Sequence, residues 1–163
     1  MGVIHMTPNA ETLAANILSQ YWDDDYFPVD PYKIADSMGI SVWEANLPSD
    51  VSGMYRRHDG KQEIYLRAQD SPNRQRFTTA HELGHAVDFP EGSFVDRKRD
   101  QLAQRGVDKH EIFANKFAAA LLMPRYAVHK LARKNWDVTQ MANFFGVSNT
   151  AMEFRLINLG LSA

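Results

Sequence analysis

The first forty residues carry two helical patterns. In the first, apolar side chains recur three and four positions apart: Leu13, Ala14, Ile17, Leu18 and Tyr21. Thr7-Pro8 supplies a hydroxyl cap and a first-turn proline, so this spacing predicts an amphipathic helix up to about Trp22. Asp30-Pro31 repeats the cap-and-proline signal and predicts a shorter helix, which Gly39 ends.

Strand-like segments replace the helical spacing after Gly39. Residues 40–43 are apolar and β-branched. Residues 51–57 and 61–67 flank His58-Asp59-Gly60, in which Asp-Gly is a strong hairpin signal. This pattern predicts a small, mainly antiparallel sheet that precedes the longer helices.

Two long helical patterns occupy the middle of the chain. Ser71-Pro72 predicts a helix over residues 72–88. Residues 91–108 are polar with mixed charge and predict no regular element. A second apolar pattern predicts a helix over residues 109–123, and Pro124 ends it or starts another.

The C-terminal segment has the form helix, turn, helix. Two apolar stripes are separated by Gly146-Val147, with Ser148 as the cap of the second helix and Gly160 at its end. The expected fold class is α+β. We expect a first domain over residues 1–134 and a C-terminal helical, helix-turn-helix-like subdomain over residues 135–163.

Composition narrows the class of protein. The chain has 163 residues, enough for one domain with a proper core. Its net charge of −2 gives no reason to expect electrostatic binding to nucleic acid or anionic lipid. Cysteine is absent, so a metal would be held by His, Asp or Glu. Neither a signal peptide nor a membrane-length apolar run is seen, and a cytoplasmic protein with no membrane partner is expected.

Candidate chemistry centres on His81-Glu82-Leu83-Gly84-His85, inside the predicted helix over residues 72–88. Residues four apart lie above one another on a helix face, so the two imidazoles can bind one metal ion. Glu82 between them would project toward the ion's open position and act as a general base. Gly84 in mid-helix costs about 1 kcal/mol relative to alanine. Its presence predicts close approach by another element, with the one that carries a third ligand as the obvious candidate.

A catalytic metal site normally has a third protein ligand. Glu111, near the start of the helix over residues 109–123, is the leading candidate because a reversing loop can bring that helix back over the histidine pair. His110 and Asp88 are the alternatives. Asn115 lies one turn after Glu111, and it either holds the free ring nitrogen of a ligating histidine or caps nearby backbone.

Two longer motifs contain these residues. They are Arg74-Gln75-Arg76-Phe77-Thr78-Thr79-Ala80-His81-Glu82-Leu83-Gly84-His85 and Glu111-x-x-Ala114-Asn115-x-Phe117-Ala118-Ala119-x-Leu121-Leu122-Met123-Pro124. With Pro28-Val29-Asp30, Val51-Ser52-Gly53 and Phe145-Gly146-Val147-Ser148, they resemble the ImmA/IrrE metallopeptidases over roughly residues 28–160. Many members have a further histidine shortly after the first motif, where this chain has Asp88-Phe89-Pro90; that position is not a ligand.

The resemblance implies a zincin-like metallopeptidase domain. His81, His85 and Glu111 would be the ligands of zinc, with manganese as the alternative metal, and Glu82 would be the general base. The resemblance also implies an intracellular enzyme whose protein substrate is a partner repressor of the helix-turn-helix class. Family members are often encoded in phages, mobile elements or stress operons.

Two other classes of function stay open. Residues 138–160 could bind DNA through Asn149, Thr150 and Arg155, although the segment lacks a basic stripe and direct nucleic-acid binding is not expected. The other class is a metal-bound, non-proteolytic module such as half of a toxin–antitoxin pair. A monomer is the default oligomeric state.

Two features of a peptidase site stay undecided. The strand that ends near Arg67 is a candidate to pair with an extended substrate. The candidate donors to the developing oxyanion are Tyr65, His110, Tyr126 and His129.

Overall fold

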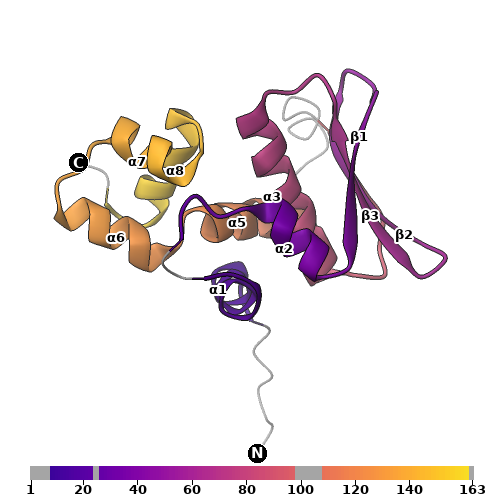
Figure 1. The fold of residues 1–163 in the computed structure, drawn as a ribbon, viewed down its shortest axis with the longest axis horizontal. Coiled ribbons are helices and arrows are strands. Elements are labelled where there is room, and N and C mark those ends of the chain that lie inside the picture. Colours follow the sequence, from indigo (N-terminus) through magenta and orange to yellow (C-terminus); the bar gives the residue numbers. More distant parts are fainter. Residues whose placement is uncertain (1–7, 24–25, 98–107, 162–163) are drawn as a thin grey trace, which may run out of the picture.

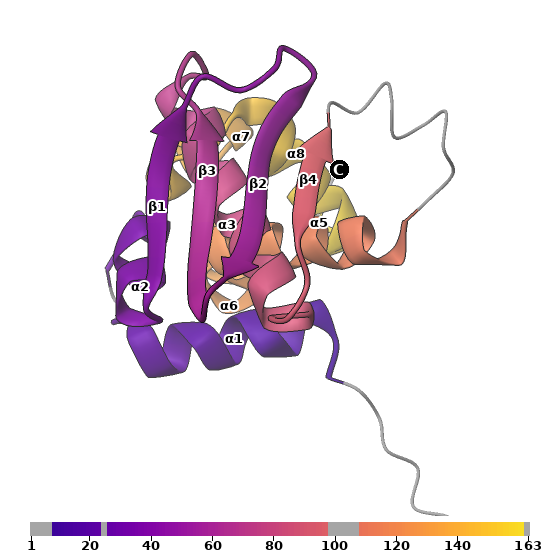
Figure 2. The same cartoon turned by 90° about the vertical axis from the view of Figure 1, so that its right-hand side faces the viewer.

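The computed structural model describes residues 8–23, 26–97 and 108–161. The elements in chain order are α1 (Ala10–Tyr21), α2 (Pro31–Ser37), β1 (Ile40–Ala45), β2 (Val51–His58), β3 (Lys61–Arg67), α3 (Pro72–Asp88), β4 (Phe94–Arg97), α5 (Lys109–Leu122), α6 (Arg125–Arg133), α7 (Val138–Phe145) and α8 (Asn149–Asn158). The sheet forms one side of the molecule (Figure 1), and Figure 2 looks onto it with the helices behind. The expected α+β class is confirmed.

The sheet has the strand order β1-β3-β2-β4. β3 pairs with β1 in parallel and with β2 antiparallel, and β2 pairs with β4 antiparallel. The prediction of a mainly antiparallel sheet is therefore confirmed. Because β3 is paired on both sides, the idea that the strand ending near Arg67 accepts a substrate strand is wrong. The edges of the sheet among the described residues are β1 and β4.

Strand β4 lies in a segment for which the sequence predicted no regular element. Its apolar residues Phe94 and Val95 pair with Tyr55 and Met54 of β2. Only four residues long, the strand is too short for an alternating pattern to stand out. It exists because β2 offers a free edge for it to pair with.

Local capping explains where the helices begin. Asp30, Ser71 and Ser148 each accept a backbone hydrogen bond at the start of a helix, as predicted. The first helix departs from expectation, because α1 begins at Ala10 and its cap is Asn9, whose Oδ1 accepts from Thr12 N at 2.8 Å. The predicted cap Thr7 lies outside the described residues.

The helices share one apolar core. It includes Leu83 of α3 and Phe117 of α5, and it continues into the C-terminal helices through Phe145 and Met152. The division into units over residues 1–134 and 135–163 stays a prediction. Among the described residues, no helix is both long and apolar enough to cross a bilayer.

Arg155 of α8 joins three parts of the chain. It is only 4% exposed, and its guanidinium donates to Glu11 of α1 at 2.6 and 3.0 Å and to the carbonyl of Met123 at 3.0 Å. A side chain committed in this way does not face DNA bases. The alternative hypothesis of DNA binding named three residues that could contact bases, and Arg155 is no longer one of them.

Candidate metal centre

Helix α3 brings two histidines together. Pro72 occupies its first turn, and Ser71 Oγ caps it by accepting from Arg74 N at 3.3 Å. The helical period then stacks His81 and His85, whose ring centroids lie 4.8 Å apart. Both side chains are buried, at 3% and 0% exposure.

Glu111 comes from the first turn of α5, which Asp108 caps by accepting from His110 N at 2.8 Å. Its carboxylate oxygens lie 3.0 Å from His81 Nε2 and 2.9 Å from His85 Nε2. The two alternative third ligands, Asp88 and His110, instead bond to one another at 2.8 Å. The structure thus gathers His81, His85 and Glu111 into one buried cluster that could hold a metal ion.

This donor set fits a small divalent cation. One ligand atom from each of the three residues lies within 4.8 Å of the others. Ligands bound at roughly 2.0–2.1 Å around a tetrahedral ion are about 3.3 Å apart, a few tenths of an ångström wider than the separations of 2.9 and 3.0 Å found here. The buried His85 Nε2 lies 2.9 Å from Glu111 Oε1, so a cation held by both atoms would replace the proton that they share.

The protonation of the cluster also suits a cation. Burial lowers the pKa of His85, which favours the neutral imidazole. Burial alone would raise the pKa of Glu111, but hydrogen bonds with His81 and His85 outweigh it and hold this pKa well below its usual range. Neutral imidazole and carboxylate are the forms that bind metals.

Two neighbours orient the histidine rings. His81 Nδ1 lies 2.9 Å from Asn115 Oδ1. Since an amide oxygen can only accept, Nδ1 donates this bond, so the proton that a metal ion would displace is the one that Nε2 shares with Glu111. The ring of His85 stacks on Phe94 of β4, with centroids 4.1 Å apart and an interplanar angle of 8°.

Two glycines, Gly84 and Gly53, allow neighbouring elements to approach the site closely. A Cβ on Gly84 would lie 3.0 Å from Ala114 Cα and 3.1 Å from Phe117 Cβ, so α3 and α5 pack closely beside the His-His-Glu cluster. The predicted close approach at Gly84, by the helix that carries Glu111, is confirmed. A Cβ on Gly53 of β2 would lie 3.1 Å from Glu82 Oε1. The fully buried Glu82 therefore rests against the sheet at a position without a side chain.

A groove of about 960 Å³ leads away from the cluster. His81, Glu111 and Asn115 line one part of it, together with Ser52 of β2 and Thr78 of α3. The remainder is lined by residues of α1, α3, α5, α6 and α8. The cluster is therefore accessible from a cavity large enough for several residues of a peptide.

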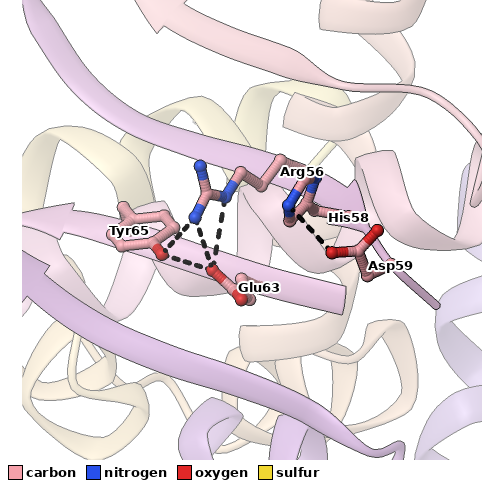
Figure 3. Close-up of polar contacts among 5 residues, drawn as sticks. All are labelled: Arg56, His58, Asp59, Glu63 and Tyr65. Atoms are coloured by element: carbon pink, nitrogen blue, oxygen red, sulfur yellow. Dashed lines mark hydrogen bonds and ion pairs between the residues drawn. The ribbon is translucent and has the colours of Figure 1, made fainter. Parts of the chain in front are cut away.

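Of the four candidate oxyanion donors, Tyr65 is committed elsewhere. Its hydroxyl donates to Glu63 and accepts from Arg56 Nη2 at 2.9 Å (Figure 3). Its strand neighbours Ile64 and Leu66 are buried in the core, so the alternation of strand side chains directs Tyr65 to the opposite face of the sheet. Tyr126 and His129 do not line the groove. His110 does not line the groove either, although it is close enough to the cluster to contribute to the lowered pKa of His85.

The sequence did not single out Phe94 or assign Gly53 a role. Phe94 belongs to the short strand β4, and its only local signal is an apolar pair within a polar segment. Gly53 was noted only as part of a resembling motif, and its role depends on the approach of Glu82 from another element. Neither role has a signature in local sequence.

The fold and the cluster together define an α+β domain in which an HExxH helix and a following helix present a buried His-His-Glu set. Residues 35–157 match the model of the IrrE N-terminal-like domain, peptidase family M78, and the chain belongs to this family.

Two known proteins are similar to this chain, one in sequence and one in fold. The chain is 30% identical to immunity region protein 2 of Bacillus phage phi105 over 122 residues, which cover 75% of this chain and 76% of the phage protein. A solved Mycobacterium tuberculosis transcriptional regulator has a similar fold, with a TM-score of 0.61 and 18% identity. The match covers 90% of this chain and 46% of the regulator.

Proposed function

We propose that this protein is a zinc-dependent endopeptidase that cleaves a partner helix-turn-helix repressor inside the cell, with manganese as the alternative metal. The observation that carries the proposal is the buried His81–His85–Glu111 cluster, two members of which, His81 and Glu111, line a large groove. Membership in a peptidase family supports hydrolysis. The name of the phage relative, an immunity region protein, supports a repressor as the substrate.

In this proposal each polar residue of the cluster has a defined task. His81, His85 and Glu111 hold the ion, and Asn115 keeps His81 in the tautomer whose Nε2 can bind it. A bound divalent ion would supply Lewis-acid activation of water and of the scissile carbonyl. Glu82 takes the proton from the attacking water and delivers it to the leaving amine.

Glu82 is well placed for proton transfer. It lies between the two histidines on α3 and is fully buried. Its carboxylate lies against Gly53, since a Cβ on Gly53 would lie 3.1 Å from Glu82 Oε1. A carboxylate held in this way loses little conformational freedom when the substrate binds.

The metal is tested first, by elemental analysis of purified protein after exposure to zinc and removal of excess. We expect about one ion per chain in the wild type and almost none in His81→Ala. His58→Ala is the matched control, because His58 is exposed at the hairpin tip. Equal metal content in wild type and His81→Ala would overturn the proposed site.

Cleavage is tested with the repressor encoded beside this gene, incubated with zinc-loaded enzyme and followed by mass spectrometry. Glu82→Gln should keep its metal and its fold but lose cleavage by a factor of about 10²–10⁴. Glu44→Gln, at an exposed position of β1, should cleave like the wild type. If Glu82→Gln also cleaves at the wild-type rate, Glu82 is not the base.

A further inference from the structure

The groove extends well beyond the metal centre, to the C-terminal helices. Thr78 and Phe77 line it from α3, and Ala151 and Phe154 line it from α8. Lys116 of α5 also lines the groove. In Figure 1, α3 lies to the right and α8 at the upper left, with α5 running below them. A chain bound at the metal centre would therefore run past α8.

The wall formed by α8 carries a large apolar side chain. Phe154 lines the groove and is 49% exposed. Phe77, Val147 and Ala151 contribute further apolar surface to the same cavity. Covering the exposed part of a phenylalanine side chain removes apolar surface from water and favours binding, and aromatic side chains in interface pockets commonly anchor a partner.

The charges of the groove are mostly positive. Apart from the metal ligands, its charged residues are Arg74, Lys116, Arg125, Arg155 and Glu11, a net charge of 4 − 1 = +3. Glu11 is bonded to the buried Arg155 at 2.6 Å and lies 3.8 Å from Arg125, and Arg74 lies 3.7 Å from Asp70. The whole chain, by contrast, has a net charge of −2. A cationic groove in an acidic protein favours an acidic occupant.

We propose that the groove between α3 and α8 binds an acidic segment of the protein substrate, with an apolar side chain of that segment packed against Phe154. This inference rests on the proposed function, since it names the part of the substrate that selects it for cleavage. Phe154 and Lys116 are specificity-determining residues, and α8 serves as a wall of the substrate groove.

Binding is measured by fluorescence anisotropy with labelled synthetic peptides and zinc-loaded Glu82→Gln protein, so that no peptide is consumed. The probes are a glutamate–leucine peptide, a lysine–leucine peptide and a glutamate–serine peptide of equal length. We expect the glutamate–leucine peptide to bind at least about tenfold more tightly than the other two. Equal or tighter binding of the lysine–leucine peptide, or no binding of the glutamate–leucine peptide, overturns the proposal.

Variants in the same background locate the binding. Phe154→Ser and Lys116→Glu should each weaken binding of the glutamate–leucine peptide at least about tenfold. The matched controls are Ile157→Ser, on the same helix, 57% exposed and outside the groove, and Lys130→Glu, at an exposed position of α6. Controls that weaken binding as much as their partners, or groove variants that bind normally, overturn the proposal.

A kinetic comparison separates this proposal from the proposed function. With the repressor as substrate, Phe154→Ser in the otherwise wild-type enzyme should raise KM and leave kcat nearly unchanged. If the wild type cleaves the repressor and Phe154→Ser cleaves it with the same KM, the docking proposal alone fails. If the wild type never cleaves the repressor but the peptide results hold, the proposed function alone fails.

Discussion

Replacing Gly84 with alanine tests how closely α3 and α5 pack at the metal centre. The new Cβ would lie 3.0 Å from Ala114 Cα and 3.1 and 3.2 Å from two atoms of Phe117. Ordinary contacts of this kind are 3.5–4.0 Å. The backbone atom of Ala114 can give way only if α5 moves, and α5 carries Glu111.

Two opposing terms determine the size of the effect. Alanine is favoured over glycine in a helix by about 1 kcal/mol, whereas an added methyl group in a well-packed core costs about 1–3 kcal/mol. We therefore expect Gly84→Ala to lower the free energy of unfolding by about 0–2 kcal/mol. For a domain of this size, 1 kcal/mol corresponds to about 2–4 °C in Tm, so Tm should fall by up to about 8 °C.

The assay is thermal unfolding followed by circular dichroism, with Asn16 as a matched reference. Asn16 is exposed on α1, so the difference between Asn16→Ala and Asn16→Gly measures helix propensity without steric crowding. Subtracting this difference from the effect of Gly84→Ala isolates the cost of crowding. If Gly84→Ala stabilises the protein as much as glycine-to-alanine replacement does at position 16, the helices are not in tight contact there and the reasoning is wrong.

Three further predictions concern the ligands and the core. Asn115→Ala should lower zinc affinity about 10–100-fold in calorimetric titration without changing Tm of the metal-free protein by more than a few degrees, because only the orientation of a ligating ring is lost. Arg155→Met should lower the free energy of unfolding by about 2–4 kcal/mol in urea titrations, because it leaves Glu11 without its closest partner; the exposed Arg133→Met should have little effect. Zinc binding should weaken on acidification, since protons compete for the ligands, by about tenfold per pH unit for each protonated histidine. Burial lowers the pKa of His85, so protons compete for this ligand only at pH values below the usual histidine pKa of about 6.5. Zinc affinity that rises as the pH falls would refute the ligand assignment.

Features set by neighbouring residues were predictable from sequence. The caps at Asp30, Ser71 and Ser148 and the turn at Gly146 depend on side-chain and backbone groups within a few positions, so the local sequence indicates them. The juxtaposition of His81 and His85 is equally local, because helical geometry alone sets it.

Features that depend on distant partners were decided by the tertiary structure. β4 exists because β2 offers it an edge, and β3 became an interior strand because β1 also pairs with it. The start of α1 is a local feature that the prediction missed, since the side chain of Asn9 caps the helix.

The sequence by itself determined the helix that carries His81, Glu82 and His85, and it required that something pack closely against Gly84. Only the tertiary structure decided that the packed face of α5 directs Glu111 at the histidines while His110 turns to Asp88. The physical reason is that the rotation of one helix against another is set by the burial of whole faces, here that of Ala114 and Phe117 on Gly84. Such burial involves residues far apart in the chain, which no local pattern records.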